Sequence, residues 1–130
     1  MLTPIVPVGQ SVPPGLSQAI LIKGGNLLLL SGLVSTNSEG AIIGNDLESQ
    51  LLQTFENIAG TLKAAGTDFH SVARLTYYIV NYQPSHLQVI RSVRDRFINL
   101  EKPPASTLIG VAALALPNFL VEVDTIAVVP

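Results

Sequence analysis

Two acidic residues near the end of the chain, Glu122 and Asp124, are the first candidates for chemistry. Side chains alternate between the faces of a strand, so carboxylates two residues apart in LVEVDTIAVV share one face. A carboxyl group that is buried in a cleft has a raised pKa and can donate a proton or anchor a hydrogen bond. The same pair could also form a solvated strand end, and the sequence favours neither interpretation.

Small hydroxyl residues and a glycine mark two other strand ends. Ser106 and Thr107 follow the pair Pro103–Pro104 at the start of the apolar segment ASTLIGVAALAL. Ser31 and Gly32 end the run LLLL, and a glycine there would let backbone N–H groups approach a ligand closely. Taken alone, Ser31 and Gly32 are better explained as a simple strand-end turn.

The chain has a single cluster of basic residues, which lies in a predicted helix. This cluster consists of Arg91, Arg94 and Arg96. Arg91 and Asp95 are four residues apart, a spacing at which opposite charges pair on an exposed helix surface. We therefore expect a solvated helix face, with Arg91 as a ligand-binding residue only if it turns toward a cleft.

The standard nucleotide, hydrolase and metal motifs do not occur. There is no Walker loop, no G-x-S-x-G sequence and no G-x-G-x-x-G sequence after a strand. His70 and His86 lie far apart at element boundaries and lack the spacing of metal ligands. The chain has no cysteine, which excludes disulfides, thiolate catalysis and cysteine metal sites. We expect no metal and no organic cofactor.

The composition indicates a single domain, residues 1–130, that does not remain a monomer. Hydrophobic residues make up 48% of the chain and charged residues 12%, against about 25% in typical domains. The longest apolar run, LLLL, is far shorter than the roughly 20 residues of a membrane span, and the N-terminal segment has no basic residue. We therefore expect a homo-oligomer in the cytoplasm, with no membrane. The net charge of −2 argues against nucleic acid as a partner.

The first half of the chain predicts two strands and a helix. The strands lie in SQAILIKGGNLLLLSGLV and are joined as a hairpin at residues 23–26, where glycines supply positive φ angles. The helix begins at an Asn45 cap completed by Glu48 and ends at Gly66. Its apolar residues recur at helical spacing: Leu47, Leu51, Phe55, Ile58 and Leu62.

The second half predicts three strands and a second helix. HSVARLTYYIV is a strand, Ser85 and Gln88 cap a helix that ends before Pro103, and two strands follow in ASTLIGVAALAL and FLVEVDTIAVV. Two helices cannot cover both faces of a sheet of five or six strands, so we expect an α+β domain with both helices on one face. The strands are apolar on both faces, and another subunit would cover the open one.

Several stretches of the chain, in this order and spacing, resemble the Rid family, the reactive-intermediate deaminases also called YjgF or L-PSP endoribonuclease-like proteins. They are GLSQAI, LLLLSG, DLESQLLQTFENIAGTLKAAG, RLTYYIVN, PPAST and LVEVDTIAVV. The resemblance implies a chorismate-mutase-like α+β fold: a six-stranded mixed sheet with two helices on one face, assembled as a homotrimer. It also implies small-molecule ligands in clefts between subunits and catalysis without a cofactor.

The chain departs from this family at the site itself. Deaminating members carry an arginine in a Pro-Ala-Arg-Ser motif that grips the substrate carboxylate, and here Ser106 takes its place. Leu16 stands where those members have a tyrosine, and Arg91 falls at or next to a frequent asparagine. Glu122 matches the family glutamate. The resemblance thus implies Glu122 as the catalytic residue. It implies these ligand-binding residues: Ser106, Thr107, Ser31, Gly32, Leu16 and Arg91.

Two functions follow from this pattern. The first is a hydrolase or deaminase of a non-standard imine, enamine or amide, with weak or no activity on ordinary 2-imino acids, because Ser106 cannot supply the charge-assisted clamp of an arginine. The second is a non-catalytic trimeric protein that binds a metabolite. Whether Glu122 and Ser106 share a cleft would distinguish them. An endoribonuclease role is disfavoured, because the chain is acidic and lacks a histidine acid–base pair.

Overall fold

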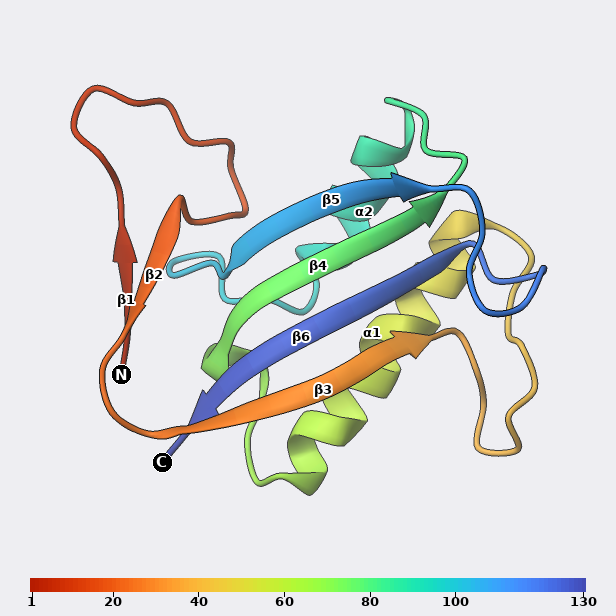
Figure 1. The fold of residues 1–130 in the computed structure, drawn as a ribbon, viewed down its shortest axis with the longest axis horizontal. Helices are drawn as coiled ribbons and strands as arrows, with labels where there is room; N and C mark the ends of the chain where they lie inside the picture. The colour runs from red at the N-terminus through yellow and green to blue at the C-terminus, as the bar shows by residue number, and fades with distance from the viewer.

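The computed structural model describes residues 1–130 and contains two α-helices and six strands (Figure 1). In chain order the elements are β1 (Leu2–Ile5), β2 (Ala19–Ile22), β3 (Asn26–Val34), α1 (Leu47–Ala64), β4 (Val72–Val80), α2 (His86–Arg94), β5 (Ala105–Val111) and β6 (Val121–Val129). A short 3-10 turn at Phe69–Ser71 precedes β4. No helix is both long and apolar enough to cross a membrane.

The main sheet has four strands in the order β3-β6-β4-β5. β6 runs antiparallel to both of its neighbours, and β5 runs parallel to β4, so the sheet is mixed. Both helices lie behind the sheet and leave the other face open (Figure 1). The predicted α+β class, with two helices on one face, is confirmed. The six strands do not form one ladder, because β1 and β2 pair only with each other.

The predicted hairpin between β2 and β3 is wrong. Gly24 and Gly25 do have positive φ angles, of 71° and 79°, but they direct the chain from one sheet to the other. A Cβ atom on Gly25 would lie 2.7 Å from the Val128 side chain, so this close crossing requires glycine. β2 instead pairs with β1, a strand that was not predicted because the N-terminal segment is rich in proline. Pro4 is tolerated because an edge strand can lack one N–H group.

Helix α1 begins one residue later than predicted. The side chain of Asp46, rather than Asn45, caps it by accepting a hydrogen bond of 2.8 Å from the backbone N–H of Ser49. Gly66 follows the end of the helix with a φ of +78°, which confirms the predicted C-terminal glycine.

Helix α2 begins at the predicted place with a different cap. Ser85 has helical dihedral angles and makes no side-chain capping bond, so the predicted capping box with Gln88 is wrong. His86 closes the preceding turn, because its Nδ1 atom accepts a hydrogen bond of 3.0 Å from the N–H of Gln83.

The core lies between the helices and the covered face of the sheet. The predicted apolar stripe of α1 is confirmed, since Leu51, Phe55, Ile58 and Leu62 are fully buried. They pack against inward side chains of β4 and β6, namely Leu75, Tyr77, Ile79, Val121 and Val123. Period-two alternation then sends the intervening residues of β4 and β6 to the open face, where chemistry could take place.

Candidate functional site

The predicted site residues fall into two groups on opposite faces of the main sheet. In the β4–β5 ladder Ser106 lies beside Leu75, which is buried under the helices, and Thr107 lies beside Thr76. Because neighbours in a strand point to opposite faces, Ser106 faces α2 and Thr107 faces the open side. Glu122 is also on the open side, so Glu122 and Ser106 do not share a cleft within one chain.

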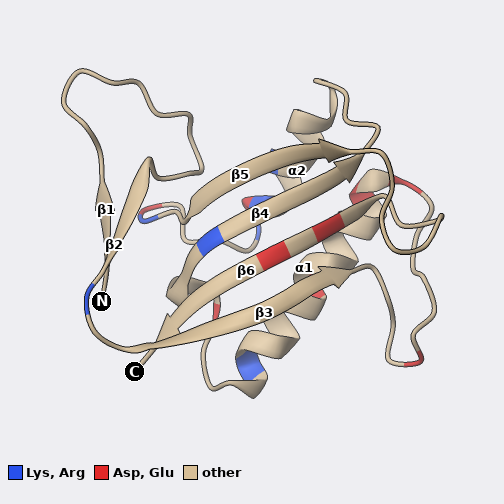
Figure 2. Cartoon of the chain, in the orientation of Figure 1, with Lys and Arg blue, Asp and Glu red and all other residues tan.

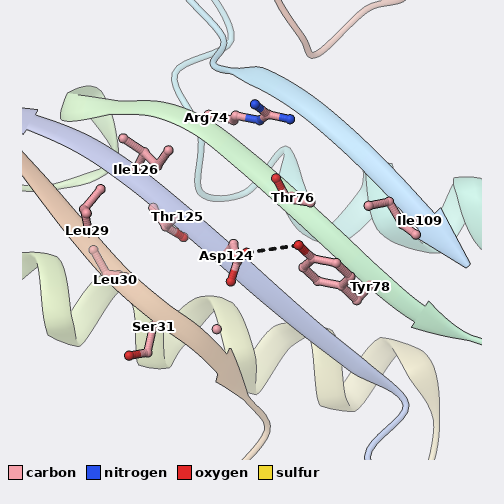
Figure 3. Close-up of a pocket in the computed structure, with 11 residues that line it drawn as sticks. Leu29, Leu30, Ser31, Arg74, Thr76, Tyr78, Ile109, Asp124, Thr125 and Ile126 are labelled. Carbon is pink, nitrogen blue, oxygen red and sulfur yellow. Dashed lines mark hydrogen bonds between the residues drawn. The ribbon is translucent and has the colours of Figure 1, made fainter. Parts of the chain in front are cut away.

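The open face holds a cavity of about 490 Å³ over β3, β4 and β6 (Figure 3). Its lining other than aliphatic side chains consists of Ser31, Gly32, Arg74, Thr76, Tyr78, Asp124 and Thr125. Thr107 adjoins the cavity, since its Oγ1 atom accepts a hydrogen bond of 3.0 Å from Nη2 of Arg74. Ser31 and Gly32 therefore line a cavity and are more than a strand-end turn.

Glu122 and Asp124 lie in the body of the sheet. Glu122 pairs with Val34 on β3 and with Tyr78 on β4, so it is flanked by strands on both sides. The Tyr78 hydroxyl donates a hydrogen bond of 3.1 Å to Oδ2 of Asp124 (Figure 3). These contacts exclude the interpretation of the acidic pair as a frayed, solvated strand end.

Gly32 makes room for this acidic pair. A Cβ atom at this position would overlap the Glu122 carboxylate and would lie 3.0 Å from Oδ1 of Asp124. The sequence suggested that Gly32 would bring backbone N–H groups close to a ligand. In this chain, the space that its missing side chain leaves is occupied by the protein's own carboxylates.

The surroundings of Glu122 favour its protonated form. Partial burial raises the pKa of its carboxyl group above the ordinary value of 4.5, and the negative charge of Asp124 raises it further. The hydrogen bond to Asp124 in turn raises the pKa of Tyr78. Figure 2 shows the acidic segments of β6 beside a basic segment of β4 on this face. Glu122 can therefore hold a proton at a pH at which an exposed glutamate has lost it.

A second cavity, of about 210 Å³, lies on the covered side between α2 and β5. Leu16, Arg91 and Ser106 line it together, although they lie far apart in the sequence. Arg91 thus does face a cavity, at its exposed rim. We call this space the α2–β5 cavity.

Two further residues of the α2–β5 cavity, Arg94 and Tyr77, were not among the predicted site residues. Arg94 is only 6% exposed, which contradicts the predicted solvated helix face. Asp95 pairs with Arg94 at 2.9 Å, not with Arg91 as its spacing predicted. The burial of Arg94 could have been predicted from the sequence, because Arg94 follows Ile90 by four residues and so belongs to the apolar stripe of α2.

Comparison with known proteins places the chain in a family. The profile described as Endoribonuclease L-PSP matches residues 13–129, almost the whole chain. The chain belongs to this family. Its structural neighbours carry the Rid and YjgF names, so the predicted Rid resemblance is confirmed.

Two curated Rid relatives are similar over most of this chain. The putative regulator AldR of Lactococcus lactis is 34% identical over 85% of this chain and 83% of its own length. The chloroplastic Reactive Intermediate Deaminase A of Arabidopsis thaliana is 32% identical over 85% of this chain and 57% of its own length. A relative described as a regulator and a relative described as a deaminase are thus about equally similar.

The solved structures agree with the fold. YyfB from Yersinia pestis, a Rid protein of unknown function, superposes with a TM-score of 0.92 at 34% identity over 98% of both chains. RidA from an Antarctic Psychrobacter superposes with a TM-score of 0.72 at 27% identity, and the match covers 97% of this chain and 94% of the RidA chain.

The histidines of this Rid protein do not converge on a site. His70 lies 3.4 Å from the Asp68 carboxylate at an exposed turn, and His86 is engaged in the turn before α2. No three His, Asp or Glu side chains lie close enough together to hold a metal ion. The acid pair on the open face and the α2–β5 cavity remain as the candidate sites.

Proposed function

We propose that this Rid protein hydrolyses the C–N bond of a small imine, enamine or amide, with Glu122 as the acid–base group. The observation that carries the proposal is the raised pKa of Glu122 beside a cavity lined by hydroxyl groups. A general acid or base works best when its pKa lies near the working pH. A partly buried glutamate with a raised pKa meets this condition better than an exposed one.

The chemistry for an imine balances with water alone. The Glu122 carboxyl donates its proton to the imine nitrogen, and the resulting carboxylate takes a proton from the water that attacks the imine carbon. The carboxyl next protonates the amino group of the tetrahedral adduct, and the C–N bond breaks to release ammonia. The carboxylate then takes the proton of the adduct's hydroxyl group, which leaves a ketone and restores the carboxyl. Neither an oxidant nor a cofactor is consumed in these steps.

The charges of the open face favour an uncharged or cationic substrate. Glu122 and Asp124 lie on one face of β6, and the nearby guanidinium of Arg74 is exposed and donates to Thr107. A substrate carboxylate would be repelled by these two acidic groups. This face has no buried arginine to bind the carboxylate. Ordinary 2-imino acids are therefore poor substrates in this proposal.

The proposal places the complete site between subunits of a homotrimer. Within one chain, the residues that match the family pattern lie on both faces of the sheet, with Ser106 on one face and Glu122 on the other. A second chain is therefore needed to bring the Ser106 group of one subunit to the Glu122 group of another. The open face offers apolar surface for such contact, with Leu27 63% and Leu29 68% exposed. Exposed leucines gathered on one sheet face are typical of protein–protein interfaces.

A direct test is the hydrolysis of 2-aminoacrylate generated in situ, followed by pyruvate release. We expect a rate close to that of buffer alone, because the arginine that lines this cavity, Arg74, is exposed and already donates to Thr107. The Arabidopsis Reactive Intermediate Deaminase A serves as the comparison enzyme under the same conditions. Acceleration by this protein to the level of that deaminase would refute the proposed substrate class.

The alternative function is a trimeric protein that binds a metabolite without turnover. The separation of Ser106 from Glu122 on opposite faces favours it, because a ligand that contacts Ser106 does not reach Glu122 of the same chain. Under this alternative, no imine, enamine or amide is hydrolysed faster than in buffer.

A further inference from the structure

A third cavity lies between the small sheet of β1 and β2 and the start of β4. Its volume is about 300 Å³, and it shares no lining residue with the open-face cavity or with the α2–β5 cavity. In Figure 1, β1 and β2 lie beside the end of the main sheet at which β4 begins and β6 ends. We call this space the β2–β4 cavity. It contains none of the site residues that the sequence predicted.

One side of the β2–β4 cavity is apolar. Its apolar lining consists of Met1, Leu2, Pro4, Ile20, Val72 and Val128. These residues come from both sheets, and β1 is held in place because the carbonyl of Met1 accepts a hydrogen bond of 2.8 Å from the N–H of Lys23. A floor of this kind suits the hydrocarbon part of a ligand, since small-molecule sites are lined mostly by apolar side chains with a few polar groups.

The other side of the cavity is polar and carries a positive charge. Its polar lining consists of His70, Ser71, Asn99 and Lys102. Lys102 forms no ion pair with an acidic side chain, and no Asp or Glu lines the cavity. The unpaired ammonium group of Lys102 therefore favours an anionic ligand.

Asn99 and His70 offer further hydrogen bonds. Oδ1 of Asn99 accepts a hydrogen bond of 3.1 Å from the N–H of Glu101, and its Nδ2 group has no protein acceptor. Nδ1 of His70 lies 3.4 Å from Oδ1 of Asp68, so Nε2 is the ring nitrogen that remains for a ligand. A ligand in this cavity can thus bond to side chains from two separate segments of the chain.

The segment that carries Asn99 and Lys102 is fixed in position beside β2. The N–H of the buried Ser17 donates a hydrogen bond of 3.0 Å to the carbonyl of Pro104, and the Ser17 hydroxyl donates one to the carbonyl of Pro103. The two prolines also restrict the backbone, because their rings fix φ. Polar groups that are in place before a ligand arrives lower the entropic cost of binding.

We propose that the β2–β4 cavity binds a small phosphate monoester, with Lys102 as the cation and the Nδ2 group of Asn99 as a second donor. Lysine binds phosphate as a point charge. A phosphate has three terminal oxygens and can reach donors on different sides, whereas the two oxygens of a carboxylate lie in one plane. The organic group of the ester would contact the apolar floor.

His70 and the cavity volume also fit this ligand. A phosphate monoester loses its second proton at about pH 6, so Nε2 of His70 can accept a proton from the P–OH group or, when protonated, donate to a phosphate oxygen. A volume of 300 Å³ corresponds to about ten water molecules at ~30 Å³ each, which is enough for a phosphate that carries one ring.

This binding site does not depend on the proposed hydrolysis. Glu122 is not among the residues that line the β2–β4 cavity. A binding measurement therefore tests this cavity alone, and the hydrolase activity can fail or hold separately.

The test is an NMR titration of the assembled protein with phenyl phosphate, in a phosphate-free buffer of low ionic strength. Phenol has the same ring without the phosphate, benzoate replaces the phosphate with a carboxylate, and inorganic phosphate lacks the ring. We expect phenyl phosphate to shift the amide signals of Ser71 and Asn99, and to bind about tenfold or more tightly than each of the other three.

Two variants test the polar side of the cavity. Lys102→Gln should weaken the binding of phenyl phosphate by about five- to tenfold, because it removes the cation. Asn99→Asp should weaken it by about tenfold, because it replaces the Nδ2 donor with a negative charge and keeps the oxygen that accepts from Glu101. Both positions are at least partly exposed, so the fold should tolerate the changes.

Lys63→Gln is the matched control. Lys63 is also an exposed lysine, but it lies in the last turn of α1 and does not line the cavity, so its loss should leave binding unchanged. The proposal is overturned if phenyl phosphate does not bind, or if phenol, benzoate or inorganic phosphate binds as tightly. It is also overturned if neither Lys102→Gln nor Asn99→Asp weakens binding.

Discussion

Replacing Glu122 with glutamine is expected to lower kcat/KM for the hydrolysis of a neutral ketimine by about 10²–10⁴-fold. Glutamine keeps the size of the side chain but cannot pass a proton to the imine nitrogen or take one from water. Benzophenone imine is a suitable probe, since it is uncharged and its ketone product can be followed by absorbance. The assay compares the rates of the two proteins with that of buffer.

The control for this substitution is Glu39→Gln, which removes an acidic group from an exposed loop distant in sequence from the site. Its kcat/KM should equal that of the wild-type protein. An effect of Glu122→Gln on KM alone, with kcat unchanged, would show that Glu122 contributes only to binding. That result would contradict Glu122 as the acid–base group, whereas hydrolysis no faster than in buffer by the wild-type protein would favour the non-catalytic metabolite-binding protein.

Replacing Phe55 with alanine is expected to lower the free energy of unfolding by about 3–5 kcal/mol. Phe55 is fully buried, and its ring lies 5.7 Å from that of Phe69 and 5.1 Å from that of Phe97. Alanine would leave a cavity in this aromatic cluster and remove the contact that supports Tyr77. Urea unfolding followed by circular dichroism measures the loss.

Leu100→Ala is the matched control for Phe55→Ala, because Leu100 is 54% exposed and lies outside the core cluster. Its effect should stay within about 0.5 kcal/mol. Protein concentration must be held constant, since subunit association would add to the measured stability. A loss below about 1 kcal/mol for Phe55→Ala would contradict the packing described for α1.

Local patterns in the sequence predicted most of the fold. The apolar stripe of α1 and the alternation in β4 report burial directly, because each follows the period of its own element. The choice of strand partners is not local, and the hairpin predicted at Gly24–Gly25 failed for this reason. Glycines predict a positive φ, but they do not predict whether the chain turns back or crosses to another sheet.

The candidate site was predictable only in part. Alternation within β6 correctly placed Glu122 and Asp124 on one face. The separation of Ser106 from Glu122 depends on the register between strands, which one sequence does not contain. Arg94 could have been found, because it occupies an apolar position of α2, but its charge led to the prediction of a solvated face.

The pH dependence of kcat/KM for benzophenone imine tests the role of Glu122 most directly. Because the pKa of Glu122 is raised in the folded protein, its proton is held above pH 4.5 and lost at higher pH. As a proton donor it should give a kcat/KM that is highest below this raised pKa and falls above it, with an inflection that Glu122→Gln abolishes. A profile that lacks the inflection, or that keeps it in Glu122→Gln, would contradict acid–base catalysis by Glu122.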